Sequence, residues 1–278
     1  MLAETRRRML LDLISRQGFA TLDELVKSLG VSESTVRRDL ESLDLAGVVR
    51  RTHGGAVFQG ELKALAALED RAGKSATEKQ AIGRAALGLI EEGDTVLLDG
   101  GTTTLEVARG IAEQDRALQV VTNSIPIAQL LASRPSIDLI MIGGYIYPRT
   151  GVALGPLALA TMQGIKVRKA ILGAGGIVAE GIYNANMLLV ESERRMMSCA
   201  QETIIVADST KFGRLALARL CGLDEVNRLV VDAGLRDEDH RMLEQAGLLV
   251  HIAEATNGTA AEGRPNGPLT PEGPRNDV

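Results

Sequence analysis

Ser32-Glu33-Ser34-Thr35-Val36-Arg37-Arg38-Asp39-Leu40 is the stretch that decides the N-terminal fold. It places hydroxyl side chains in the first turn of a predicted helix, with Ser32 as the cap, and two arginines one turn later. A recognition helix enters the DNA major groove by its amino-terminal end, where hydroxyl groups approach phosphates and bases and arginine bridges guanine or grips a phosphate. The stretch therefore predicts a DNA-reading helix, in which Asp39 is expected to pair with an arginine.

The residues before this stretch predict two more helices. Apolar residues recur at helical spacing from Thr5 to Ala46, with breaks at residues 17–19 and 30–31. Residues 21–24 read Thr-Leu-Asp-Glu, the form of a capping box, so the second helix is expected to start near Leu22. Three helices in this order favour a helix-turn-helix over the alternative that the two arginines are only part of a solvated charged face.

The residues after the stretch predict a wing. Gly47 should end the third helix, and residues 48–56 form a short extended run that turns on the pair Gly54-Gly55. Arginines on this wing would lie across the neighbouring DNA backbone, whereas a lone histidine such as His53 is more often incidental. The expected DNA contacts are Ser32, Ser34, Thr35, Arg37, Arg38, Arg50 and Arg51.

The composition describes a folded chain with an aliphatic core. Of 278 residues, 45% are hydrophobic and 24% charged, and there are no Trp, three Phe and three Tyr. So few aromatic rings argue against nucleic-acid binding by base stacking. Residues 1–56 hold nine Lys and Arg against eight Asp and Glu, and the remainder holds 22 against 28, within a net charge of −5. This asymmetry gives modest support to a local DNA contact near the N-terminus.

Cysteine usage and the N-terminus indicate a cytoplasmic protein. Cys199 and Cys221 are too few for a disulfide framework or a zinc cluster, so reduced thiols, no metal and no cofactor are expected. Asp12 and Arg16 interrupt the apolar residues that follow the N-terminal arginines, so no signal-peptide core is predicted. No apolar run reaches the length of a membrane span.

The larger part of the chain predicts a parallel sheet covered by helices. After a helix expected over Thr77–Ile90, short Val/Ile/Leu runs alternate with helix-like stretches up to His251. Such alternation is typical of an α/β domain with a largely parallel sheet. The expected strands are Thr95–Leu98, Gln119–Val121, Ile137–Ile142, Ala170–Leu172, Thr203–Ala207 and Arg228–Val231.

The loops after these strands predict an anion-binding pocket. The first strand runs into Asp99-Gly100-Gly101-Thr102-Thr103-Thr104 and then a helix expected to begin near Leu105. Glycines let the backbone come close, hydroxyls donate, and amides at a helix start favour a phosphate, although a tight turn alone would use the same residues. Ligands bind beyond the carboxyl ends of parallel strands, where these loops should meet. For Lys211, the alternative is an ordinary solvent-exposed lysine in a loop. The expected effector-binding residues are Asp99, Gly100, Gly101, Thr102, Thr103, Thr104, Asn123, Gly143, Gly144, Gly175 and Lys211.

The sequence resembles the DeoR family of bacterial regulators. That family's head begins with an arginine followed by apolar residues four and eight positions later, as Arg6, Leu10 and Ile14 do here. After a gap of seventeen residues come Ser32 and the Thr-apolar-Arg-Arg-Asp-apolar run at residues 35–40. The resemblance extends over about residues 4–252. It implies a winged helix-turn-helix followed by a larger α/β sensor domain similar to ribose-5-phosphate isomerase, and a repressor of a sugar or carbohydrate operon that responds to a phosphorylated sugar.

The resemblance also indicates that the body is not an enzyme. By position, residues 173–177 (Gly-Ala-Gly-Gly-Ile) would occupy the place of the isomerase's acidic loop, and glycine cannot shuttle a proton between sugar carbons. No catalytic residue is therefore expected. Glu180, Glu191 and Glu193 lie downstream and offer an alternative base, but Glu191 and Glu193 fit better as exposed or pocket-lining positions at the start of a helix. Residues 183–187 (Tyr-Asn-Ala-Asn-Met) depart from the Thr/Ser-rich version common in the family, so the identity of the sugar does not follow.

The expected organisation is a DNA-binding domain at residues 1–57, a linker at 58–76, a sensor domain at 77–253 and a disordered tail at 254–278. The expected partners are a double-stranded DNA operator, a phosphorylated sugar effector and further copies of the chain in a homo-oligomer, with no membrane. The rival hypotheses are a sugar-phosphate isomerase with an added DNA-binding head, and a protein-interaction module whose body binds no small molecule.

Overall fold

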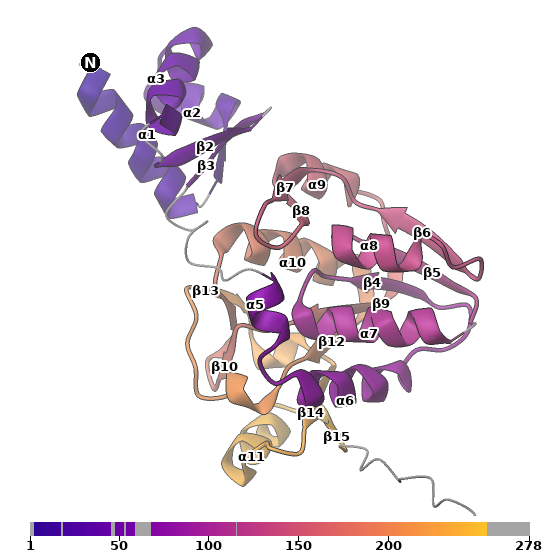
Figure 1. Cartoon of the computed structure of the whole chain (residues 1–278). Coiled ribbons are helices and arrows are strands. Elements are labelled where there is room, and N and C mark those ends of the chain that lie inside the picture. The colour runs from indigo at the N-terminus through magenta and orange to yellow at the C-terminus, as the bar shows by residue number, and fades with distance from the viewer. Residues whose placement is uncertain are drawn as a thin grey trace, which may run out of the picture.

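The computed structural model describes residues 3–17, 19–45, 48–52, 54–58, 68–114 and 116–254. Within these ranges the chain forms a small N-terminal head and a larger α/β body (Figure 1). The expected tail from residue 255 onward, residues 59–67 of the expected linker, Gly47 and His53 lie outside the described residues.

The head is a winged helix-turn-helix, as the sequence predicts. Its three helices pack against an antiparallel sheet of order β1-β3-β2, in which β2 and β3 form the wing. The capping box at the start of α2 is present, since Glu24 N donates to Thr21 Oγ1 at 3.2 Å and Thr21 N donates to Glu24 Oε2 at 2.8 Å. Gly55 is required where the wing crosses β1, because an added Cβ would lie 2.1 Å from the carbonyl oxygen of Ala20. The elements are α1 (Ala3–Gln17), β1 (Phe19–Thr21), α2 (Leu22–Leu29), α3 (Glu33–Leu45), β2 (Val49–Thr52) and β3 (Gly55–Phe58).

The body is built on a seven-stranded sheet, confirming the predicted α/β class. All six neighbouring pairs are parallel, and the strand order is β15-β14-β12-β9-β4-β5-β6. The six predicted strands are all present, and the sheet gains a seventh, β15, at one edge. The strands are β4 (Thr95–Leu98), β5 (Leu118–Thr122), β6 (Ile137–Met141), β9 (Val167–Gly173), β12 (Ala200–Val206), β14 (Arg228–Asp232) and β15 (Leu249–Ala253).

Helices cover both faces of this sheet and bury two separate cores. Side chains alternate along each strand, so Leu97 packs into one core while Val96 and Leu98 pack into the other. α6, α7 and α8 cover the second face (Figure 1). The start of α7 near Leu105 was predicted wrongly, since the helix begins three residues earlier, at Thr102. The helices are α5 (Leu68–Ala72), α6 (Ala76–Leu87), α7 (Thr102–Glu113), α8 (Ile125–Leu131), α9 (Pro156–Thr161), α10 (Met187–Cys199) and α11 (Asp237–Gln245), with short 3-10 turns at Ser209–Lys211 and Leu223–Glu225.

Two small antiparallel sheets complete the body beside the main one. A hairpin of β7 and β8 lies on the side that faces the head (Figure 1), and a three-stranded sheet has the order β10-β11-β13. Of the described helices, none is long and apolar enough to span a bilayer. The strands are β7 (Tyr145–Tyr147), β8 (Val152–Leu154), β10 (Gly176–Val178), β11 (Gly181–Asn184) and β13 (Ala218–Cys221).

Candidate effector pocket and DNA-binding head

A pocket of about 310 Å³ lies at the carboxyl ends of β4, β5, β9 and β12. Loops that are far apart in sequence meet there, including residues 99–103 after β4, Asn123 after β5, residues 173–175 at the end of β9, and Asp208 after β12. This is the position at which parallel sheets bind ligands, and the volume is at the lower end of the range for small-molecule sites.

Asp99 fixes the backbone that forms the floor of the pocket. Its carboxylate is fully buried and accepts hydrogen bonds from the amides of Gly101 (2.9 Å) and Gly173 (2.7 Å) and from the hydroxyl of Thr104. Burial raises the pKa of this carboxyl, and the three donors act in the opposite direction. Asp99 therefore ties the start of α7 to the end of β9.

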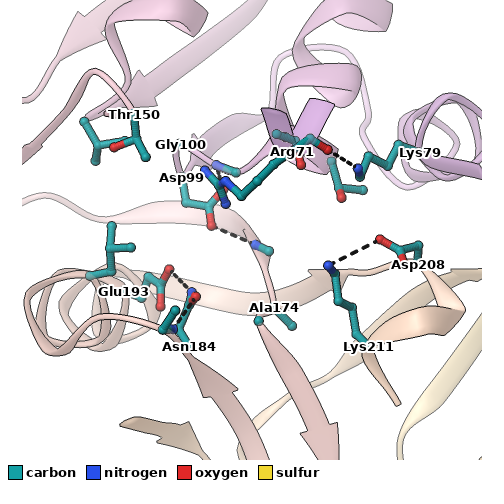
Figure 2. A pocket seen from close by; sticks show the side chains of 18 of the residues that line it. Arg71, Lys79, Asp99, Gly100, Thr150, Ala174, Asn184, Glu193, Asp208 and Lys211 are labelled. Carbon is teal, nitrogen blue, oxygen red and sulfur yellow. Dashed lines mark hydrogen bonds and ion pairs between the residues drawn. The ribbon is translucent and has the colours of Figure 1, made fainter. Parts of the chain in front are cut away.

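Cations gather on one side of the pocket, around the N-terminus of α7. The Lys79 side chain comes from α6, is only 3% exposed, and donates to the carbonyl oxygens of Arg71 (2.7 Å) and Lys74. No ion pair of the described residues includes Lys79, and burial lowers its pKa. Lys211 lies across from it, with its Nζ 3.8 Å from the Asp208 carboxylate (Figure 2). Two ammonium groups beside the backbone amides at the start of a helix are suited to binding an anion.

The other side of the pocket carries acidic and polar groups, and the Arg71 guanidinium interacts with two of them, Asp99 and Glu193. Glu193 of α10 is 4% exposed, and its Oε1 accepts from Asn184 Nδ2 at 2.7 Å (Figure 2). Burial is the main cause that raises its pKa, to about 8, and the charge of Asp99 adds to the effect. Buried polar atoms that line the pocket have no hydrogen-bond partner in the described structure, namely Arg71 Nε, Asn123 Oδ1, Thr150 Oγ1, Ser192 Oγ and Glu193 Oε2.

Most of the predicted effector residues line this pocket. Asp99, Gly100, Gly101, Thr102, Thr103, Asn123, Gly175 and Lys211 lie on its wall. Three others do not. Thr104 is buried beneath the loop with its hydroxyl on Asp99, and Gly143 and Gly144 lie beside the hairpin and α9, where an added Cβ on Gly144 would come 2.8 Å from the carbonyl oxygen of Leu154.

Sequence reasoning missed the pocket residues that come from the predicted linker and from helices. Arg71 of α5, Lys74 and Ser75 precede the first strand of the sheet, and Lys79 lies within α6. Their signal in the sequence is only a Lys/Arg-rich stretch at residues 71–79 ahead of the first strand. No group of metal-ligating side chains occurs within the described ranges.

The head presents the predicted DNA-reading edge to solvent. Ser32, Ser34, Arg37 and Arg38 at α3, and Arg50 and Arg51 on β2, are exposed, and Thr35 is partly exposed. The Ser32 hydroxyl stands at the start of α3 and contacts the hydroxyls of Ser34 (3.0 Å) and Thr35 (2.8 Å). The contacts with DNA remain predictions.

Asp39 has the structural role expected from the sequence. It is buried on α3 and forms an ion pair with Arg6 of α1, whose Nε and Nη2 both donate to its carboxylate. The pair joins the first and third helices, so Asp39 does not face the DNA-reading edge.

The head contacts the body through Phe19. Its ring is 8% exposed and packs in one cluster with Tyr147, Val152 and Leu154 of the β7–β8 hairpin and with Leu188 of α10. Val152 also lines the effector pocket, where an added Cβ on Gly100 would lie 2.2 Å from its Cγ2. A single side chain thus separates the pocket loop from the site at which the head docks.

Comparison with known proteins identifies both parts of the chain. Residues 6–61 match the DeoR-like helix-turn-helix domain, and residues 74–233 match the DeoR C terminal sensor domain. An HTH-type transcriptional regulator of Haemophilus influenzae is 32% identical, with 84% of this chain and 91% of the relative covered. The transcriptional repressor AccR of Agrobacterium fabrum is 34% identical over the same shares. The HTH-type transcriptional repressor GlcR of Bacillus subtilis is 29% identical over 93% of this chain and 99% of its own. Among solved structures, ribose 5-phosphate isomerase A of Methanocaldococcus jannaschii gives a TM-score of 0.36 at 16% identity, covering 48% of this chain and 53% of its own.

Proposed function

The chain belongs to the DeoR family of DNA-binding transcriptional regulators, and we propose that it is a repressor of a carbohydrate operon that a phosphorylated sugar releases from its operator. The observation that carries the proposal is the buried Lys79 ammonium, which has only backbone carbonyls as described partners, at a pocket that also holds Lys211 and the N-terminus of α7. A buried ammonium that forms no ion pair is costly even with the charge of Asp208 nearby, and a phosphate dianion would neutralise it.

The remaining groups of the pocket suit the sugar part of such a ligand. Asn123, Thr150 and Ser192 each have a buried polar atom that finds no partner among the described residues. Native proteins pair nearly all their buried polar groups, so a cluster of unpaired ones on one cavity wall indicates hydroxyl groups of a ligand. Among the relatives, one is described as a putative aga operon transcriptional repressor, and its name agrees with a carbohydrate effector.

The β7–β8 hairpin is our candidate for the connection between ligand and head. Thr150 and Val152 face the pocket, Tyr147 and Leu154 pack on Phe19 of the head, and the carbonyl of Arg149 accepts from the amide of Leu68 at the start of α5 (3.0 Å). A ligand that moves this hairpin or α5 would change the surface of the body on which the head packs. We therefore propose that ligand binding alters how two heads of an oligomer are spaced for DNA.

Pairing of heads is part of the proposal because one head carries little net charge. DNA affinity rises with the number of phosphates that a protein neutralises, and residues 1–56 have a net charge of only +1. Two heads about one DNA turn apart, roughly 34–36 Å, would read a repeated or palindromic operator with useful affinity.

The test is fluorescence anisotropy on a fragment of the operon's own promoter, repeated with ribose 5-phosphate, fructose 6-phosphate, glucose 6-phosphate and inorganic phosphate. We expect one sugar phosphate to weaken DNA binding at least tenfold. Lys79→Met should keep DNA binding and lose this response, whereas Lys166→Met, which removes an exposed lysine outside the pocket, should behave like the wild type. Turnover of a sugar phosphate with no effect on DNA affinity would instead favour an isomerase and refute the proposal.

A further inference from the structure

Glu193 occupies the part of the effector pocket that lies away from Lys79 and Lys211 (Figure 2). Its carboxyl group is held in place, because Oε1 accepts the 2.7 Å hydrogen bond from Asn184. Its other oxygen, Oε2, is buried and has no partner among the described residues. An oxygen fixed at a cavity wall and left unpaired is a group available to a molecule that enters the cavity.

Burial, more than the groups that face it, favours the protonated form of Glu193 at neutral pH. Asp99 on the pocket floor opposes its ionisation, and Arg71 of α5 and the Asn184 amide favour it, but burial outweighs them and raises the pKa to about 8. Cys221 of β13 is close enough to interact electrostatically with Glu193, but burial raises the pKa of that thiol to about 12, so it adds no charge. At pH 7 the side chain is a carboxylic acid, which accepts from Asn184 and donates one hydrogen bond.

Besides the oppositely charged Arg71 and Asp99, two uncharged hydroxyl groups lie in the same pocket. Among the described residues the hydroxyls of Thr150 and Ser192 have no hydrogen-bond partner, and both residues are at least nine-tenths buried. The opposite charges of Asp99 and Arg71 give a ligand carboxylate no net attraction here, and a ligand ammonium would require Glu193 to release its proton first. A hydroxyl or carbonyl oxygen meets neither cost.

We infer that Glu193 determines effector specificity, by donating a hydrogen bond to an uncharged hydroxyl or carbonyl oxygen at the end of the sugar phosphate remote from its phosphate. The inference rests on the proposed function, which supplies the phosphate end. A protonated Glu193 would favour the binding of neutral sugar phosphates over that of sugar acid phosphates and amino sugar phosphates. The departure of residues 183–187 from the family's Thr/Ser-rich version fits this role, since that segment supplies Asn184.

The test is calorimetry at pH 7 and pH 9, between which the charge of a sugar phosphate changes little because its second pKa is about 6. The probes are glucose 6-phosphate, fructose 6-phosphate, ribose 5-phosphate, glucosamine 6-phosphate, 6-phosphogluconate and inorganic phosphate. With a pKa of about 8, the protonated share of Glu193 falls from about nine-tenths to about one-tenth between these pH values. The neutral sugar phosphate that binds best should therefore bind about tenfold more weakly at pH 9.

Two variants and a control separate Glu193 from other titrating groups such as Lys79. Glu193→Gln, whose amide still donates, should keep the pH 7 affinity within about threefold and lose the tenfold decrease. Glu193→Ala should bind the sugar phosphate about tenfold more weakly while inorganic phosphate binds as in the wild type, which also shows that the pocket is folded. Glu191→Gln, on the same helix but exposed, should keep the full pH response.

Retention of the tenfold decrease in Glu193→Gln would overturn the inference. So would a wild type that prefers glucosamine 6-phosphate or 6-phosphogluconate and loses that preference in Glu193→Gln. Either result with intact phosphate binding leaves the proposed function standing. Failure of every phosphate probe to bind the wild type would overturn the proposed function, and this inference with it.

Discussion

Arg37→Ala separates DNA reading from folding, because the structure gives this side chain almost no structural role. Its guanidinium is half-exposed, and its described partner is Glu33, four residues earlier on α3, at 2.7 Å and 2.8 Å. Exposed ion pairs of this spacing contribute about 0.3–0.5 kcal/mol. We therefore expect the melting temperature of the head to fall by no more than about 2–4 °C.

The expected cost to DNA binding is much larger. An arginine that bridges guanine contributes about 1–3 kcal/mol of base discrimination, which corresponds to about 5-fold to 150-fold in affinity for each head. The assay is anisotropy on the specific operator and on a scrambled duplex, at one fixed salt concentration. A base-reading Arg37 loses affinity mainly for the operator, whereas a phosphate contact loses it equally for both sequences.

Asp39→Ala is the matched control, two residues further along the same helix. It removes the buried carboxylate that accepts two hydrogen bonds from Arg6, and so breaks the ion pair that joins α1 to α3. This variant should lose thermal stability first and DNA binding only as a consequence. Equal losses of stability in Arg37→Ala and Asp39→Ala, or an Arg37→Ala protein with wild-type operator affinity, would refute the assignment of Arg37 to the reading edge.

Two further outcomes are expected. Phe19→Ala should retain both DNA binding and sugar-phosphate binding but lose most of the effect of one on the other, and an undiminished effect in the anisotropy assay would contradict the docking role of this ring. Cys199 and Cys221 are both buried, and burial raises the pKa of the Cys221 thiol to about 12. Neither thiol should therefore react with iodoacetamide at pH 8 until denaturant is added. Rapid labelling of the native protein, detected by mass spectrometry, would contradict this.

The head could be predicted nearly completely because its signals are local. The capping box at residues 21–24, the stop before the wing and the arginine run on α3 each depend on neighbours within a few residues. The main sheet was equally readable, since strands buried on both faces are continuous apolar runs. β15 was not predicted, because it is an edge strand with exposed Leu249 and Ile252 and a histidine at its centre.

The pocket could be predicted only where strand ends supply it. Residues 99–103, Asn123 and Lys211 follow strands, so the parallel topology brings them together. Lys79 carried no such signal, because a lysine within a helix is normally solvated and only the tertiary fold buries it against the carbonyls of Arg71 and Lys74. For Glu191 and Glu193 the sequence allows an exposed or a pocket-lining position, and only the tertiary fold shows that Glu193 is buried and Glu191 exposed.

The two lysines of the pocket should play different parts in release from DNA. A ligand shifts an equilibrium only by the difference in its interactions with the two states. Lys79 and Arg71 belong to α6 and α5, the segment through which the chain enters the body from the head, whereas Lys211 follows β12 within the body. Charge-assisted hydrogen bonds contribute about 1.5–3 kcal/mol each, so two that form in only one position of this segment supply about 3–6 kcal/mol, close to the roughly 5.5 kcal/mol that reverses a 1:99 population. We therefore expect Lys211→Met to need more sugar phosphate yet still to reach full release from DNA at saturation, and Lys79→Met to fall short of full release at any concentration. A titration in which both variants reach the same plateau would show that α5 and α6 contribute affinity without directing the head.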